Sequence, residues 1–589
     1  MSDREVVALA VIAWLGAIVG WRTGLGPPAL VGAIVAVVAL VLKRPPLLFV
    51  ALALLTSGRA ATDARGLADP QLGAVTGWAT LVDDPTPVAT GAVQVEVRLG
   101  GRHVLASARG APAVALQRLA AGEQALVEGT LRRAPPSAAW LTRRHIATEL
   151  TVTAVDRDAP GSIIVRSANA LRGLLQRSAR ALPTEQRALY LGFVLGDDRG
   201  QPAAIVDDFR GSGLTHLLAV SGENVAFVLV LVAPALRRLG LRSRWLATLG
   251  VIAFFALVTR FEPSVLRASV MAGLAATAVM LGREATGLRV LALAVTGLLV
   301  VDPFLVGVVG FQLSVAASAA ILLLSRPIAT RVPGPRPLAD AVGVSLAAQI
   351  GVAPLLVATF GGAPVGSVVA NVLAAPAAGP VMVWGIAAGL AGGLAGPMAA
   401  TVLHLPTRLL VGWIALVAHK VARWPLGQLG WPQLGLLAAG ALGGFAAARC
   451  DRRVLRAGSG AAVALGLLSP SFAAGASPSL VTSIAGAELW RDGAAAVLVV
   501  SGRAEAADLL AGLREDNVGH LDLVVVTRTP SGTVVDAIAT GVPIGGVVLP
   551  DSLRAAAVAT VGSLRVEITP DGNGLTVVVT ADGGRDPPV

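Results

Sequence analysis

The chain has 589 residues, of which 54% are hydrophobic and 14% are charged. Soluble domains carry about 25% charged residues, so the composition excludes a wholly soluble protein and predicts an integral membrane protein. The net charge of +11 indicates basic cytoplasmic loops or an anionic partner such as nucleic acid or lipid headgroups, and the one cysteine excludes an intrachain disulfide and a cysteine-based zinc site.

Residues 1–58 are predicted to form N-terminal transmembrane helices. The apolar stretches Val6–Trp21 and Ala29–Leu42 approach the roughly 20 residues that a spanning helix needs. A third stretch, Pro46–Leu55, is shorter, and we interpret it as half of a helical hairpin or as an interfacial segment. No small-residue cleavage site follows the first stretch cleanly, so we expect a retained helix rather than a signal peptide.

Residues 59–158 have a sequence pattern typical of a small β domain. Charged residues return, apolar runs shorten and alternate, and turn residues such as Asp83-Asp84-Pro85 separate them. The predicted strands are Gly77–Leu81, Val93–Leu99, Arg102–Ala108, Gln124–Thr130 and His145–Val155. Five short strands in about 90 residues predict an external OB-like β-barrel, with an SH3-like barrel as the structural alternative.

Residues 159–185 predict a basic amphipathic helix that lies on a membrane surface. Its apolar side chains, from Ile163 to Leu182, fall on one helical face. Its arginines are expected largely on the other face: Arg166, Arg172, Arg177 and Arg180.

Residues 186–472 are predicted to form the transmembrane core. Its apolar segments are Leu214–Leu236, Trp245–Val258, Ser264–Leu281, Leu288–Val301, Leu305–Leu324, Ala339–Ala358, Pro364–Leu390, Thr401–Val421, Leu434–Ala448 and Leu455–Leu468. With the N-terminal helices these give about 11–13 membrane segments. In this arrangement the arginine-rich loops share one side, which predicts that this side is cytoplasmic and that both soluble regions are extracytoplasmic.

A linker at residues 473–479 leads to a C-terminal soluble region, residues 480–589. Strands are predicted at Ala495–Val500, Leu521–Thr527, Ile544–Leu549, Ser563–Ile568 and Leu575–Thr580. Helices are predicted between them at Ala504–Leu513 and Asp551–Ala559. This order predicts an external α/β domain.

Several polar side chains interrupt the apolar core and are candidates for a path through the membrane. Unpaired polar groups at membrane depth are costly, so they normally face a bundle interior or an aqueous path. Arg267 is the sharpest candidate, because it carries a permanent charge near the start of an apolar segment. The candidate path residues are His216, Ser221, Gly222, Glu223, Asn224, Arg267, Gln312, Gln349 and Asn371.

Each of these residues also has a structural interpretation. The polar stretch around Ser221 fits a helix N-cap at the interface. Arg267 could snorkel from a helix end, or pair with Glu262 or Glu223 and hold the bundle together. The amides are often found joining helices. The sequence has no phosphate loop, G-x-G-x-x-G or H-E-x-x-H motif, so nothing predicts ATP hydrolysis, and directional transport would take its energy from elsewhere.

Motifs in the core resemble the ComEC family of competence DNA-uptake channels. The most specific match is Phe209-x-Gly211-x-Gly213-Leu214-Thr215-His216, continued through Ser221-Gly222. Further matches follow in the family's order: Pro263-Ser264-Val265-Leu266-Arg267-Ala268, Asp302-Pro303-Phe304, Gly310-Phe311-Gln312-Leu313-Ser314, Gln349-Ile350-Gly351-x-x-Pro354 and Asn371-Val372-Leu373-Ala374-Ala375-Pro376. Together with the domain layout, the resemblance covers most of the chain.

The resemblance implies a channel in the bacterial inner membrane that imports one strand of DNA during natural transformation. The OB-like domain would then handle DNA outside the membrane. Its few aromatic residues, chiefly Trp78 and Trp140, favour phosphate contacts over base stacking. The candidate DNA-binding arginines are Arg132, Arg133, Arg143 and Arg144. The implied partners are single-stranded DNA, membrane lipids, an external DNA receptor, and a cytoplasmic helicase or single-strand-binding proteins.

The chain departs from its relatives at two places that bear on function. Many relatives carry a histidine two positions after Ser221-Gly222, where this chain has Glu223-Asn224. Many also have a metallo-β-lactamase-like C-terminal domain with an H-x-H-x-D-H motif after a strand. The corresponding segment here, Thr527–Thr533, has no histidine or carboxylate to bind a metal. We therefore expect a degenerate domain with no metal, cofactor or catalytic residue, and a separate nuclease.

Two other classes of function stay open from the sequence. A transporter of another anionic or lipid-linked solute would also need a polar path through an apolar core. A membrane-bound nuclease is the third class, and the missing metal ligands argue against it.

Overall fold

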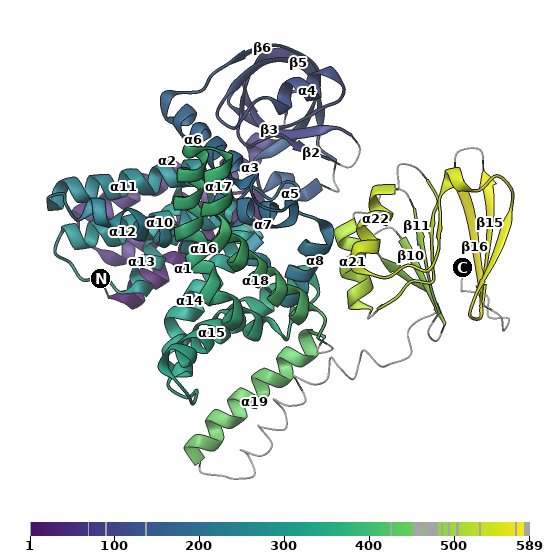
Figure 1. The fold of residues 1–589 in the computed structure, drawn as a ribbon. Coiled ribbons are helices and arrows are strands. Elements are labelled where there is room, and N and C mark those ends of the chain that lie inside the picture. The colour runs from purple at the N-terminus through teal and green to yellow at the C-terminus, as the bar shows by residue number, and fades with distance from the viewer. Residues whose placement is uncertain are drawn as a thin grey trace. The chain divides into compact units, whose positions relative to one another are not determined.

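The computed structural model describes residues 2–68, 70–88, 91–135, 138–218, 220–424, 427–450, 466, 481–484, 487–492, 495–501, 506–516, 518–528, 532–571 and 574–581 (Figure 1). The chain divides into two compact units. The first unit comprises Met1–Arg199, Ala219–Val352 and Ala378–Val411. The second comprises Gly200–Leu218, Ala353–Ala377 and Gly412–Val589.

Eight helices in the described ranges are long and apolar enough to cross a membrane, so the chain is a multi-pass membrane protein as its composition predicts. They are α1 (Asp3–Thr23), α3 (Pro45–Ala68), α11 (Leu241–Val258), α12 (Pro263–Met280), α14 (Val309–Ala329), α15 (Arg336–Phe360), α16 (Ser367–Ala395) and α18 (Leu405–Ala422). The shorter apolar helices are α2 (Ala29–Val41), α10 (Glu223–Leu236) and α13 (Gly287–Val301).

Helix α3 is longer than the sequence predicts, because it continues past Leu55 to Ala68. Small residues on α1 allow the two helices to pack closely. A β-carbon at Gly16 would lie 2.9 Å from the Ala53 carbonyl oxygen, and one at Gly20 would lie 2.1 Å from that of Ser57. This packing buries part of the more polar half of α3, which is why hydropathy alone underestimates the helix.

Three predicted core spans are each divided in two. Leu214–Leu236 forms α9 (Thr215–Leu218) and α10, whereas Leu305–Leu324 forms the 3-10 helix η2 (Pro303–Gly307) and α14. Thr401–Val421 forms α17 (Pro397–Leu403) and α18. Breaks at membrane depth persist only where neighbours satisfy the freed backbone groups. Ser264 donates to the Val220 carbonyl, Gln312 to that of Val306, and Trp384 to that of Leu403.

The last two predicted spans have different outcomes. Leu434–Ala448 lies within α19 (Trp431–Cys450). Leu455–Leu468 lies outside the described residues except for Gly466. The linker at 473–479 also lies outside them.

The OB-like barrel is confirmed as a closed five-stranded β-barrel in the first unit. Its strands are β1 (Gly73–Leu81), β3 (Val93–Leu99), β4 (Arg102–Ala108), β5 (Gln124–Arg133) and β6 (Ile146–Ala159), and the two-residue strand β2 (Thr86–Pro87) pairs with β3. The order β1-β5-β6-β4-β3 closes because β1 also pairs with β3. Only β4 and β6 pair in parallel among the barrel strands, and α4 (Ala111–Gln117) precedes β5. The alternation places Val93, Val95 and Val97 in the barrel core.

The predicted amphipathic helix forms as α6 (Ile163–Ala179), followed by α7 (Thr184–Leu195). Arg166, Arg177 and Arg180 are exposed, as expected for a polar face. The prediction is wrong for Arg172, which is buried. The reason is that a carboxylate and two backbone carbonyls surround its guanidinium, so burial does not leave its charge unpaired.

The C-terminal domain, in the second unit, is the predicted α/β domain. A five-stranded sheet has the order β13-β12-β11-β10-β9, and a three-stranded sheet has the order β14-β15-β16. Helices α21 (Ala506–Glu515) and α22 (Gly532–Gly541) pack on one face of the larger sheet through Leu509, Leu513 and Ile538. The smaller sheet covers the other face, where Val497 meets Leu564 and Val566 (Figure 1).

The strand bounds of this domain are β9 (Val481–Ile484), β10 (Ala487–Asp492), β11 (Ala495–Val500), β12 (Leu523–Val526), β13 (Val547–Val548), β14 (Ala557–Val561), β15 (Leu564–Asp571) and β16 (Gly574–Ala581). The helix predicted at Asp551–Ala559 is wrong. That segment forms the 3-10 helix η3 (Pro550–Ser552) and then β14, which pairs with β15. Antiparallel pairing outweighs the local helix preference of the alanine run. The sequence also missed α22, β9 and β10.

Candidate functional site

Arg267 lies early in α12 and is 8% exposed. Its Nε donates a hydrogen bond to Ser314 Oγ of α14 at 2.7 Å, and its Nη1 lies 3.0 Å from Met271 Sδ. Both partners are neutral. Within the described ranges no carboxylate pairs with this guanidinium, so the expected alternative of an ion pair with Glu262 or Glu223 has no counterpart in the structure. Arg267 is a buried charge held by neutral groups.

Gly222 makes room for the Arg267 side chain. A β-carbon at this position would lie 2.7 Å from Arg267 Nη2 and 3.1 Å from the β-carbon of Ala268. Ser264, one turn before Arg267, donates a hydrogen bond to the Val220 carbonyl at 2.8 Å. The motif segments around Ser221-Gly222 and around Pro263–Ala268 therefore meet, and the glycine is required by the closeness of the guanidinium.

The polar residues beside Gly222 mainly support the break before α10. Ser221 Oγ donates to Asn224 Oδ1 at 3.1 Å, and Asn224 Nδ2 donates to the Phe193 carbonyl at 2.8 Å. Asn224 is buried, whereas Glu223 is exposed in the first turn of α10, where a helix favours a negative charge. Asn224 thus fixes the position of the break.

The three amide side chains proposed to line the path lie on α14, α15 and α16 and have different surroundings. Gln312 Nε2 donates to the Val306 carbonyl of η2 at 2.7 Å. Gln349 lies on α15, which packs on α14 where a β-carbon at Gly351 would meet the Ala316 carbonyl oxygen at 2.7 Å. Asn371 Nδ2 donates to the Ser367 carbonyl of its own helix at 2.8 Å.

The structure brings some of the candidate path residues together. Arg267 meets Gly222 and Ser314 directly, and Ser221 and Asn224 are next to Gly222 in sequence. His216, on α9, and Asn371 belong to the second unit instead. Ser314 is a contact that the sequence prediction missed, although it closes the quoted motif Gly310-Phe311-Gln312-Leu313-Ser314. A serine hydroxyl is common within membrane helices, so its residue type alone does not indicate a site.

The four arginines predicted to bind DNA on the barrel are not equivalent. Arg132 and Arg133 are exposed at the end of β5, and Arg133 also donates to the Ala68 carbonyl at 3.1 Å. Arg144 is neutralised by Glu96, whose Oε2 lies 2.9 Å from its Nε, and by Asp83. Arg143 is half-buried. Arg132 and Arg133 are therefore the two of the four that present their charge most openly.

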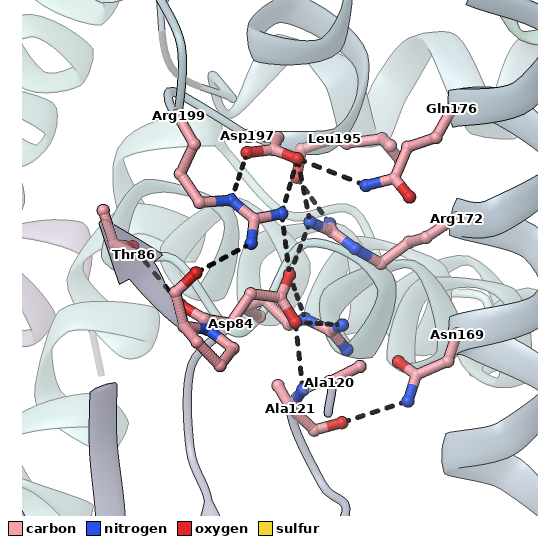
Figure 2. A network of polar contacts seen from close by, with 12 residues as sticks. Asp84, Thr86, Ala120, Ala121, Asn169, Arg172, Gln176, Leu195, Asp197 and Arg199 are labelled. Atoms are coloured by element: carbon pink, nitrogen blue, oxygen red, sulfur yellow. Dashed lines mark hydrogen bonds and ion pairs between the residues drawn. The ribbon is translucent and has the colours of Figure 1, made fainter. Parts of the chain in front are cut away.

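Asp84, in the loop after β1, is the centre of an ionic network between the barrel and the core (Figure 2). Arg172 Nη2 donates to its carboxylate at 2.9 Å, Arg260 Nη2 at 2.7 Å, and the Ala121 backbone N–H at 2.9 Å. Burial alone would raise the pKa of Asp84, but Arg172 and Arg260 outweigh it and hold the pKa at about 2. The carboxylate therefore stays charged at any physiological pH.

Arg172 extends this network to two helix ends. Its Nη1 donates to the carbonyl of Leu195, the last residue of α7, at 3.0 Å, and to that of Val258, the last residue of α11, at 2.7 Å. A cation is favoured at a helix C-terminus. Asp197 pairs with Arg199 at 2.7 Å, and Arg199 Nη2 lies 3.6 Å from Asp84 (Figure 2). The barrel is thus fastened to α6, α7 and α11.

A second attachment joins the barrel to η2. His145 Nε2 lies 2.9 Å from Asp302 Oδ1, and its ring stacks on Phe304 with ring centres 4.4 Å apart. Asp302 Oδ1 also accepts the Phe304 backbone N–H at 2.9 Å. Burial lowers the pKa of His145, but the hydrogen bond and charge of Asp302 outweigh this and raise it. The motif Asp302-Pro303-Phe304 therefore holds the barrel by binding and stacking on His145.

The C-terminal domain contains no group of three or more histidine, cysteine, aspartate or glutamate side chains that could hold a metal, as far as its described residues go. Residues 529–531 of the segment Thr527–Thr533 lie outside those residues. A metal-free domain stays a prediction from the sequence, as does its relation to metallo-β-lactamases.

Comparisons with known proteins agree with the motif series. Residues 193–453 match the family described as Competence protein. ComE operon protein 3 of Bacillus subtilis (strain 168) is 27% identical over 238 residues, which are 40% of this chain and 30% of that protein. The uncharacterized protein YcaI of Escherichia coli (strain K12) is 28% identical over 204 residues, 32% of this chain and 27% of that protein.

These matches are partial in length. Each covers less than a third of the relative's own chain. No solved structure matches this chain significantly. The resemblance seen in the motifs is nevertheless confirmed, because residues 193–453, which hold Gly222, Arg267 and Ser314, match the competence protein family model.

Proposed function

We propose that this protein is a channel that carries single-stranded DNA into the cytoplasm during natural transformation. The competence protein domain and the similarity to ComE operon protein 3 support a role in competence DNA uptake. The observation that carries the channel assignment is Arg267. It is buried where two family motifs meet, and only neutral partners contact it among the described residues.

Charge compensation gives this arginine its role. Each nucleotide carries a negative charge, which a low-dielectric path must offset, yet tight binding would stall the strand. On insertion scales an arginine at the centre of a membrane helix costs about 2.5–3.5 kcal/mol, which is an upper bound for Arg267 because it lies early in α12. A passing phosphate would offset that cost, because it supplies the missing counter-charge. A carboxylate partner would cancel the effect, and none pairs with Arg267 in the described part of the chain.

The direct test is complementation of a deletion strain with Arg267→Gln and Arg267→Lys. A loss of about 3 kcal/mol corresponds to roughly 100-fold, so Arg267→Gln should lower transformation by up to about that factor at unchanged membrane abundance. Arg267→Lys keeps the charge and should retain part of the activity. Arg238→Gln, at an exposed arginine, is the matched control. Normal transformation by Arg267→Gln would remove Arg267 from the path.

The barrel is the proposed external contact for DNA. Its exposed Arg132 and Arg133 would give weak, sequence-independent and salt-sensitive binding. The arginine-rich loops favour an extracytoplasmic barrel and C-terminal domain. Cysteine labelling at Gly101 and at Ser531 in intact cells tests this, and labelling only after permeabilisation would overturn it.

The C-terminal domain is proposed to be non-catalytic, so a separate nuclease would supply the single strand. An external receptor would deliver DNA, and a helicase or single-strand-binding proteins would take it up in the cytoplasm. The purified full chain should not cut DNA in the presence of zinc or manganese. Cleavage that is abolished by a substitution in the C-terminal domain would contradict this.

A transporter of a lipid-linked anionic solute is the second candidate. An apolar cavity of about 450 Å³ in the first unit favours it, with Leu175, Val228, Val251, Phe254 and Ile386 among its lining residues. The two functions separate in the same strains. If the cavity carries the solute, Val251→Trp should abolish transport of that solute, whereas Arg267→Gln should leave DNA uptake intact.

A further inference from the structure

Helix α8 (Ala203–Ser212), in the second unit, leads directly into the motif Gly213-Leu214-Thr215-His216. Two ion pairs link it to α21 of the C-terminal domain. Arg514 Nη1 donates to the Asp207 backbone carbonyl at 2.7 Å and also contacts the Asp207 carboxylate. Arg210 Nη1 lies 3.2 Å from Asp508 Oδ1. The C-terminal domain therefore contacts the helix in which the most specific family motif begins.

Apolar packing and a glycine strengthen this contact. Ala203 and Ala204 pack against the core cluster that contains Leu509 and Leu513 of α21. A β-carbon at Gly211 would lie 3.0 Å from Arg514 Nη1 and 3.1 Å from the β-carbon of Ala422. Gly211, the first glycine of the motif, thus permits the approach of Arg514.

The other contacts of α8 lead to the membrane helices of the same unit. His419 Nδ1, on α18, lies 2.8 Å from Asp208 Oδ2. Gly213 has a φ of +75°, and a β-carbon there would lie 2.3 Å from that of Ser367 at the start of α16. Both the left-handed backbone and the close approach require glycine. Helix α8 is therefore bonded to the C-terminal domain and to the membrane helices at once.

The two ion pairs differ in burial. The side chains of Arg514 and Asp207 are mostly buried, whereas those of Arg210 and Asp508 are largely exposed. Exposed pairs contribute little because solvent screens them. Loss of one partner of a buried pair leaves an uncompensated charge, so the Arg514 contact is the stronger of the two.

We propose that the C-terminal domain is a docking domain and that Arg514 is the positioning residue by which it holds α8 and the motif Gly213–His216 in place. The inference rests on the proposed function in DNA uptake. It gives the domain a role that needs no metal, because Arg514 acts through Asp207 and not on the strand itself.

Two measurements on the full chain in membranes test the proposal. The first is cross-linking of Arg210→Cys to Asp508→Cys with a short bifunctional thiol reagent, in a Cys450→Ser background. Docking predicts a cross-link whose yield falls when Arg514→Ala is added. Failure to cross-link would overturn the docking contact, whatever the protein transports.

The second measurement is transformation. Arg514→Ala should lower it by about tenfold, the effect of losing roughly 1.4 kcal/mol, at unchanged membrane abundance. Arg565→Ala, in an exposed pair of the same domain, is the control and should have no effect. The exchange Asp207→Arg with Arg514→Asp should restore both the cross-link and part of the uptake, which a general loss of folding would not do.

The outcomes separate the two hypotheses. A cross-link that forms while Arg514→Ala transforms normally would overturn the positioning role. If neither Arg514→Ala nor Arg267→Gln changes DNA uptake, the proposed function fails, while the cross-link still reports on docking.

Discussion

The region around Asp84 and the region around Gly222 each bury an arginine, Arg172 in the first and Arg267 in the second. Their exposed fractions are similar, 4% and 8%. Arg172 is bonded to a carboxylate and to two helix-terminal carbonyls, whereas Arg267 is bonded to a hydroxyl and a thioether. The two buried arginines therefore differ in their partners and not in their burial, and the proposed function assigns a role in transport to Arg267 alone.

This comparison predicts that the two regions respond in opposite ways to substitution. An arginine whose guanidinium is fully hydrogen-bonded, such as Arg172, stabilises the fold. Its removal should therefore loosen the barrel from the membrane helices. An arginine that lacks a counter-ion does not stabilise the fold, so its removal should leave stability unchanged or raise it and, on the proposed function, should lower transport. Stability and transport can therefore be measured separately at the two sites.

The largest effect is expected for Asp84→Asn. The substitution leaves Arg172 and Arg260 without their shared carboxylate, and breaking a buried pair in this way costs about 3–5 kcal/mol. The thermal unfolding temperature of the purified protein and its abundance in the membrane should both fall. Glu128→Gln, at an exposed barrel position, is the control. An unchanged unfolding temperature would show that the network does not hold the barrel.

The next prediction compares Arg267→Met with Arg172→Met. Arg267→Met removes a buried charge that has no carboxylate partner in the described ranges, so the unfolding temperature should stay the same or rise, while transformation falls by up to about 100-fold. Arg172→Met should lower the unfolding temperature. Similar destabilisation by both substitutions would make Arg267 a structural residue.

A smaller effect is expected for Gly222→Ala. The new β-carbon would lie 2.7 Å from Arg267 Nη2 and would displace the guanidinium. Transformation should fall by about tenfold, equivalent to about 1.4 kcal/mol, because the charge is moved and not removed. Gly297→Ala, where a β-carbon meets nothing within 4 Å, should transform normally. Equal activity of the two variants would mean that the guanidinium position does not matter.

The smallest effect concerns the barrel. Arg132→Glu with Arg133→Glu should weaken binding of single-stranded DNA by the full chain in detergent. The slope of log affinity against log salt should become less negative by about 0.7 for each phosphate that the barrel no longer neutralises. Arg144→Glu should instead lower the unfolding temperature, because Arg144 pairs with Asp83 and Glu96. Binding that ignores salt would point to a protein partner.

The sequence pattern predicted helices and strands well where burial of apolar side chains alone decides the local structure. Alternation defined the barrel strands, and hydropathy defined most membrane helices. The prediction failed where distant partners decide, as for β14, which pairs with β15 instead of forming a helix. Helix α3 was underestimated because packing buries part of its more polar half.

In the candidate site, too, local pattern identified some residues, whereas others depend on distant partners. Arg267 could be selected from the sequence, because a charge in an apolar run is conspicuous. Its partner Ser314 could not, since a serine is unremarkable in a helix. The Asp84 network was also invisible, because Arg172 and Arg260 lie 88 and 176 residues away along the chain. The sequence showed Asp84 only as part of a turn.

The two attachments of the barrel have a mechanical consequence. A domain held at one point can pivot about it, whereas Asp84 and His145 tie this barrel to α11 and to η2 at separate points. Two attachments limit pivoting of the barrel to the axis that joins them, so on the proposed function tension on a bound strand would reach the membrane helices mainly as a pull. If the barrel binds DNA as proposed, it would hold the strand at a fixed position relative to α11 and η2.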